Sequence, residues 1–139
     1  EVALKYDKAV AIHTRSAYDG MLDAVATYRG RGLRGVFHAY ASDADMARKL
    51  LKHGDFVFGI GGVVTFKNSG LDRVVAELPT ELLILETDCP YLTPVPHRGK
   101  RNESSYVEYV CRKVADIHGI TAERVDAVTT ATARRIFAL

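Results

Sequence analysis

The sequence predicts an α/β protein whose parallel βα units form about half of a TIM-type (β/α)8 barrel. Short apolar runs alternate along the chain with amphipathic segments, which is typical of successive βα units. The runs lack polar residues, as expected for parallel strands that helices cover on both faces. The chain has 139 residues, and a complete barrel needs about 250. A small open α/β sheet is the alternative architecture.

Four apolar runs are expected to be the strands. In chain order they are Ala9–Ile12, Gly35–Phe37, Phe56–Phe58 and Leu82–Leu85. Successive parallel strands joined by helices require right-handed crossovers, so the four should lie in one sheet with their carboxyl ends at the same edge.

Five segments are expected to be helices. Met21, Leu22, Val25 and Tyr28 have helical spacing, as do Met46, Leu50 and Leu51, which follow the caps Ser42 and Asp43. The remaining three are Leu71–Leu78 before Pro79, Glu103–His118 with Gly119 as its C-cap, and a last helix from Thr121 to about Phe137.

Composition fits one globular domain over residues 1–139. The chain is 47% hydrophobic and 26% charged, with a net charge of +2, which is a weak basic bias. Two cysteines make no disulfide framework, so we expect reduced thiols and a cytoplasmic location. No apolar run approaches the roughly 20 residues that cross a bilayer, and no signal peptide is visible. Glu1 is not expected to be a natural start.

Three predicted strands are followed by a side chain that can bind a metal. His13 follows the first strand, His38 the second and Asp88 the fourth, one and two βα units apart. Imidazole and carboxylate together suit Zn²⁺, Mn²⁺ or Fe²⁺. Taken singly, each histidine is explained as well by packing and hydrogen bonding, and the aspartate by capping of a turn. Their coincidence at one edge favours a shared metal site.

Glu86 and the glycines near the strand ends have two interpretations each. Glu86 stands two residues before Asp88, so in a strand both carboxylates face the same side. Glu86 then orients a metal ligand from the second shell or pairs with an arginine. The run Gly59-Ile-Gly-Gly62 fits no nucleotide-binding motif. It indicates either close backbone approach over a site or a tight turn.

Basic and aromatic residues also gather near this edge. Arg98, Lys100 and Arg101 lie in the loop after Asp88, and Arg15 follows His13. These cations are expected to bind substrate phosphates, unless the loop is only a solvated surface. A set of three aromatic residues either stacks bases at the rim or packs in the core; its members are Tyr40, Phe66 and Tyr91.

Five segments together resemble the TatD-like metal-dependent deoxyribonucleases, a branch of the amidohydrolase-type barrels. They are Ile12–Arg15, Phe37–Tyr40, Gly59–Phe66, Leu85–Leu92 and Gly99–Glu103. The run E-T-D-x-P-Y-L followed by K-R-N-E is the most specific part. The resemblance covers nearly the whole chain, with the segments in family order.

The resemblance implies a (β/α)8 barrel that holds one to three divalent metals. The family's ligands are an H-x-H pair, a glutamate, two later histidines and an aspartate. By motif, His13 and His38 match the two later histidines, and Asp88 matches the aspartate. The H-x-H pair and the glutamate have no counterpart in this sequence. The chain therefore resembles the C-terminal half of the family's barrel.

The resemblance also implies the function: hydrolysis of DNA phosphodiesters with Zn²⁺, Mg²⁺ or Mn²⁺. Asp88 is expected to bind metal and to accept the proton of the attacking water. By itself the chain is expected to be inactive or weakly active. Its open strand edges, near Val10 and Ile84, call for the missing N-terminal half or a second copy. The alternatives are another ester hydrolase of this fold, such as an aminoacyl-tRNA deacylase, and a non-catalytic fragment.

Overall fold

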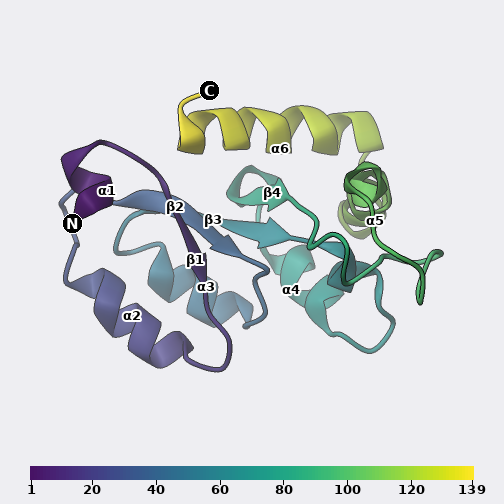
Figure 1. Cartoon of the computed structure of the whole chain (residues 1–139), viewed down its shortest axis with the longest axis horizontal. Coiled ribbons are helices and arrows are strands. Elements are labelled where there is room, and N and C mark those ends of the chain that lie inside the picture. The colour runs from purple at the N-terminus through teal and green to yellow at the C-terminus, as the bar shows by residue number, and fades with distance from the viewer.

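A computed structural model describes residues 1–139 and shows a single parallel sheet of four strands (Figure 1). The strands are β1 (Val10–His13), β2 (Arg34–His38), β3 (Asp55–Ile60) and β4 (Leu83–Leu85), in the order β1-β2-β3-β4. All four predicted strands are confirmed, although Leu82 belongs to a 3-10 turn before β4. The sheet is open, with β1 and β4 at its edges.

Helices connect and follow the strands. They are α1 (Val2–Lys5), α2 (Tyr18–Ala26), α3 (Ala44–Leu50), α4 (Leu71–Glu77), α5 (Val107–His118) and α6 (Ala122–Phe137). Short 3-10 helices span Gly62–Thr65, Thr80–Leu82 and Ser104–Tyr106. The five predicted helices are present, but α5 starts at Val107 rather than near Glu103, because residues 104–106 form a 3-10 turn. No helix combines the length and the apolar composition that a membrane span requires.

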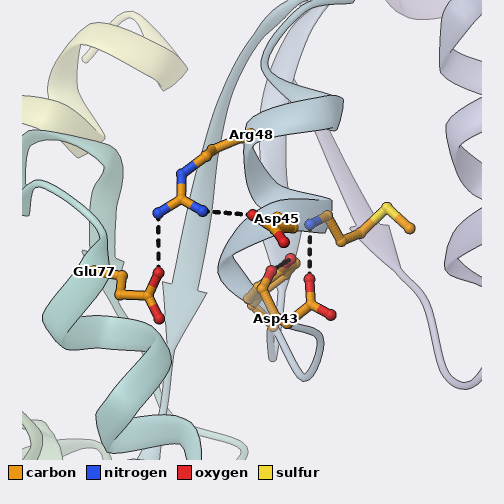
Figure 2. Close-up of polar contacts among 6 residues, drawn as sticks. Asp43, Asp45, Arg48 and Glu77 are labelled. Carbon is orange, nitrogen blue, oxygen red and sulfur yellow. Dashed lines mark hydrogen bonds and ion pairs between the residues drawn. The ribbon is translucent and has the colours of Figure 1, made fainter.

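Side chains at the helix ends satisfy backbone groups as the sequence predicts. The Asp43 carboxylate accepts a hydrogen bond of 2.8 Å from the Met46 N–H at the start of α3 (Figure 2). Thr121 caps α6 in the same way, and Gly119 ends α5 in the left-handed conformation. The Arg48 guanidinium pairs with Asp45 on its own helix and with Glu77 on α4, at 2.6 and 2.9 Å (Figure 2).

The two faces of the sheet are covered very differently. Helices α2, α3 and α4 lie on one side of the sheet, and α6 crosses the other (Figure 1). We call the first side the packed face. Its core is a cluster of 20 buried residues that includes Phe37, Phe56, Phe58 and Leu83. This cluster supplies most of the apolar burial that holds the fold together.

The opposite side, which we call the thin face, has a much smaller core. Only four buried residues form it: Val36, Val57 and Ile84 from the strands, and Ile136 from α6. On β1 the alternating burial leaves Ala11 and His13 exposed. Because side chains alternate along a strand, the residues two positions beyond Ala11 and Val36, at the ends of β1 and β2, also point to the thin face.

Candidate active site

His13 and His38 lie side by side at the carboxyl edge of the sheet. They are the last residues of β1 and β2 and are paired in the parallel register. His13 is two residues beyond Ala11 and His38 is two beyond Val36, so both point to the thin face. Their ring centroids are 5.8 Å apart. Strand register alone therefore brings the two imidazoles together.

Two carboxylates hold the His38 ring from opposite sides. Glu86 Oε1 lies 3.0 Å from Nδ1, and Asp88 Oδ1 lies 3.0 Å from Nε2. The His38 side chain is 33% exposed, against 14% for Glu86 and 25% for Asp88. The ring is thus fixed at both nitrogens within a partly sheltered pocket.

Glu86 and Asp88 lie just beyond β4, which ends at Leu85. Both carboxylates nevertheless contact the same ring, that of His38, so they face the same side of the sheet. The Glu86 N–H still donates to the Ile60 carbonyl at 3.1 Å, after which the chain leaves the sheet. The turn beyond this bond lets the two side chains meet different nitrogens of one ring.

Gly59 makes room for the Glu86 side chain. A Cβ atom placed on Gly59 would stand 2.2 Å from Glu86 Oε2, closer than any real contact. Gly59 is on β3, opposite Ile84 of β4, with its missing side chain on the thin face. Of the two interpretations of these glycines, close backbone approach is therefore the one that holds here.

The backbone at Ala39 completes the Glu86 environment. Ala39 has a left-handed φ of 48°, which is unfavourable for a residue with a side chain, and its N–H donates to Glu86 Oε1. Burial raises the pKa of Glu86, and the bonds from Ala39 and His38 oppose that rise. Partial burial on its own lowers the pKa of His38, but Glu86 and Asp88 together raise it above its usual value.

The donor chemistry at this edge fits part of a site for a divalent ion. Metal bonds to imidazole and carboxylate are about 2.0–2.2 Å long, so adjacent ligands of one ion lie about 3 Å apart. The separation of His38 Nε2 and Asp88 Oδ1, 3.0 Å, has that value. The Glu86 bond to Nδ1 has the form of the outer contact that orients metal-binding histidines in proteins. No group of three or more donors in the chain is arranged around one point, so the fit is that of a ligand pair with His13 beside it.

A pinned loop presents the basic residues that follow Asp88. Asn102 is buried, its side-chain amide donates to the Tyr91 carbonyl at 2.6 Å, and its N–H donates to the Pro90 carbonyl at 3.0 Å. The four predicted phosphate-binding residues are all exposed; they are Arg15, Arg98, Lys100 and Arg101. The asparagine of the K-R-N-E run, Asn102, therefore holds the loop in place through its hydrogen bonds.

The three candidate aromatic residues lie in different environments. Tyr40 is 1% exposed and packs on Phe58, so it belongs to the core. Tyr91 is 73% exposed. Phe66 is half-buried and lies under the Arg98 guanidinium, whose central carbon is 3.7 Å from the ring centroid. The sequence indicates Phe66 and Arg98 separately as candidate residues, but it does not predict that they are in contact.

Comparison with known proteins extends the resemblance noted in the sequence. Residues 1–138 match the family described as TatD related DNase. The metal-dependent hydrolase YabD of Bacillus subtilis, itself uncharacterised, is 38% identical over 137 residues, which are 98% of this chain and 53% of that protein. YcfH of Escherichia coli, of the same description, is 36% identical over 99% of this chain and 52% of its own length. The chain spans about half the length of these relatives.

Solved structures show the same fold. The Escherichia coli TatD homologue YJJV superimposes with a TM-score of 0.89 at 23% identity, over 99% of this chain and 53% of its own. A TatD family hydrolase of Entamoeba histolytica gives a TM-score of 0.79 at 20% identity, over 98% and 53%. The four parallel βα units thus make up about half of a TIM-type barrel, as the sequence predicts. Sequence and fold agree, and the chain belongs to the TatD-related family.

Proposed function

We propose that this chain carries part of the active site of a metal-dependent hydrolase that cleaves phosphodiester bonds of DNA. The observation that carries the proposal is the His38 ring held between Glu86 and Asp88, with His13 beside it, at the carboxyl edge of a parallel sheet. That edge is where barrels of this type place their chemistry. The family description and the relatives' description as metal-dependent hydrolases support the same assignment.

Each residue has a distinct role in the proposed reaction. His13 and His38 act as neutral imidazole ligands, and Asp88 is a carboxylate ligand that also accepts a proton from the attacking water. Glu86 holds Nδ1 of His38 and so aims Nε2 at the ligand side. A divalent ion bound there supplies polarisation of a phosphoryl oxygen and a lowered pKa for bound water. Zn²⁺, Mg²⁺ and Mn²⁺ all remain candidates for that ion.

Exposed cations near the site position the phosphates of the substrate. Arg98, Lys100 and Arg101 are on the loop pinned by Asn102, and Arg15 follows His13. These exposed side chains would attract the anionic backbone of a nucleic acid toward this edge of the sheet.

The active assembly is proposed to include further strands. The outer edges of β1 and β4 are not paired with another strand, and unpaired edges of a parallel sheet are usually covered. We expect an N-terminal half-barrel to cover them and to supply the remaining metal ligands; a second copy of this chain is the alternative. An active monomer of 15.3 kDa in solution would contradict both. The two free cysteines fit a cytoplasmic setting.

The decisive experiment replaces Asp88 by asparagine, which keeps the side-chain shape and removes the charge. Hydrolysis of DNA by the full-length protein should require a divalent ion, stop on chelation and resume when the ion is restored. Asp88→Asn should lower kcat by about 10²-fold or more, the usual value for a lost acid–base group. Asp116→Asn, on the exposed side of α5, makes the same change away from the site and should leave kcat unaltered.

Two outcomes would redirect the proposal. Undiminished turnover in Asp88→Asn removes Asp88 from the mechanism. Cleavage of a wrongly charged tRNA in preference to DNA, with the same dependence on Asp88, keeps the site but assigns it to another ester.

A further inference from the structure

A groove lined by basic and aromatic residues lies beside the candidate active site. Its volume is about 580 Å³, and it is lined by Val63, Phe66, Lys67, Asn68, Ser69, Val95 and Arg98. These residues come from two loops, one after β3 and one after β4. Both loops leave the carboxyl edge of the sheet, so the groove opens at the same end of the molecule as His38 and Asp88.

A short segment of backbone connects the candidate active site to the groove. Gly61 follows β3 directly, and a Cβ atom placed on it would be 3.9 Å from Asp88 Oδ2. The backbone then forms the 3-10 helix Gly62–Thr65 and reaches Phe66. Less than two turns of backbone therefore separate the Asp88 carboxylate from the first residue of the groove floor.

Hydrogen bonds hold the two loops together. The Thr65 hydroxyl donates to the Gly62 carbonyl at 2.7 Å and accepts from the Val95 N–H at 2.9 Å. The Phe66 N–H donates to the Val63 carbonyl at 2.9 Å. These bonds hold the backbone of the two loops together, and the Arg98 guanidinium lies over the Phe66 ring at 3.7 Å from its centroid.

The groove is positively charged and its cations are free. No acidic side chain lines it. Neither Lys67 nor Arg98 takes part in an ion pair, whereas Arg31, Arg34, Arg48, Arg112 and Arg135 each pair with a carboxylate. Exposed cations without partners attract anionic ligands most strongly. A guanidinium 3.7 Å from the centroid of an aromatic ring is at stacking distance, and its other side can receive a further flat group.

We propose that this groove binds a nucleotide of single-stranded nucleic acid next to the phosphodiester being cleaved, an inference that rests on the proposed function. The Lys67 ammonium binds the backbone phosphate. One base stacks on the guanidinium of Arg98, which Phe66 supports from below. Asn68 and Ser69 supply hydrogen-bonding groups at the same wall. Stacking on a flat surface accepts any base, so the groove adds affinity for a strand without sequence preference.

The test measures binding without cleavage. Anisotropy of a fluorescein-labelled single-stranded oligodeoxynucleotide is titrated with the protein in EDTA at several salt concentrations. Lys67→Ala should weaken binding severalfold and reduce the slope of log K against log salt by about 0.7, as for one lost phosphate contact on a single strand. Lys52→Ala is the matched control, since Lys52 is also exposed but lies before β3, at the opposite edge of the sheet.

A second variant separates stacking from charge. Arg98→Lys keeps the positive charge and removes the plane, so it should weaken binding by roughly fivefold or more, the value of one lost stacking contact. The salt slope should stay as in the unaltered protein, because the charge remains. Both side chains are exposed, so each variant should keep the fold, which thermal melts will check.

The outcomes distinguish this inference from the proposed function. The groove assignment is overturned if the unaltered protein does not bind the oligonucleotide, if Lys67→Ala behaves like Lys52→Ala, or if Arg98→Lys binds as well as the unaltered protein. Loss of binding in both groove variants, together with no divalent-dependent cleavage of DNA, supports the groove and removes the nuclease assignment instead.

Discussion

The packed and thin faces of the sheet contain the same strands but very different side chains. Phenylalanines at positions 37, 56 and 58 point into the packed face, which buries 20 residues. The thin face has Ala11 on β1, Val36 on β2, and Val57 and Gly59 on β3, and its buried apolar cluster has only four residues. One face is filled by large apolar groups, whereas the other has small residues below a polar edge.

This difference shows how one sheet serves stability and chemistry at the same time. A histidine held by two carboxylates is expensive in a dry core, because buried charges need full compensation. On the thin face His38 keeps a third of its side chain exposed, so water shares the cost. Small residues beneath it leave room for the carboxylates, as Gly59 does for Glu86. The packed face then supplies the apolar burial that the thin face lacks.

The largest effect on the free energy of unfolding is expected for two neighbouring residues, one buried in each face of the sheet. Leu83 and Ile84 are neighbours on β4; Leu83 is buried in the packed face and Ile84 in the thin face. Substituting either by alanine should cost about 2–5 kcal/mol, with Leu83→Ala near the upper end and Ile84→Ala near the lower. The free energies come from urea denaturation. Equal losses, or a larger loss at Ile84, would mean that the thin face is as tightly packed as the other.

A smaller effect is expected at Gly59. Gly59→Ala places a methyl group against the Glu86 carboxyl, and such overpacking typically costs about 1–3 kcal/mol. The displaced carboxylate also loses its contacts with His38 and Ala39. The double variant with Glu86→Ala removes the clash.

A double-mutant cycle measured by denaturation isolates this contact. Gly59→Ala should cost much less in the Glu86→Ala background than in the unaltered protein. Equal costs in both backgrounds would show that Gly59 is needed for another reason.

Much of the fold follows from local patterns. Short apolar runs indicate the four strands, and caps such as Asp43 and Thr121 mark helix starts because they satisfy nearby backbone groups. The meeting of His13 and His38 could also be predicted, since parallel register brings the ends of neighbouring strands together. These features depend on residues close in sequence or on regular strand geometry.

The remaining features depend on contacts between distant loops. The left-handed turn at Ala39 places the N–H that Glu86 accepts from, and it has no sequence signal. Phe66 and Arg98 meet only because the loops after β3 and β4 pack together. Such geometry follows from tertiary packing, which overrides local propensity.

The smallest effects are expected on the surface of α3, where a cap and an ion pair can be compared (Figure 2). Asp43→Ala removes the acceptor of the Met46 N–H and should cost about 1 kcal/mol. Arg48→Met removes the pairs with Asp45 and Glu77 but keeps the apolar stem, and it should cost less than the cap. Thermal denaturation at low and high salt separates the two, because salt should weaken the exposed ion pairs more than the short cap hydrogen bond. If Arg48→Met cost as much as Asp43→Ala at high salt, the ion pairs that link α3 and α4 would stabilise the fold as much as the cap does.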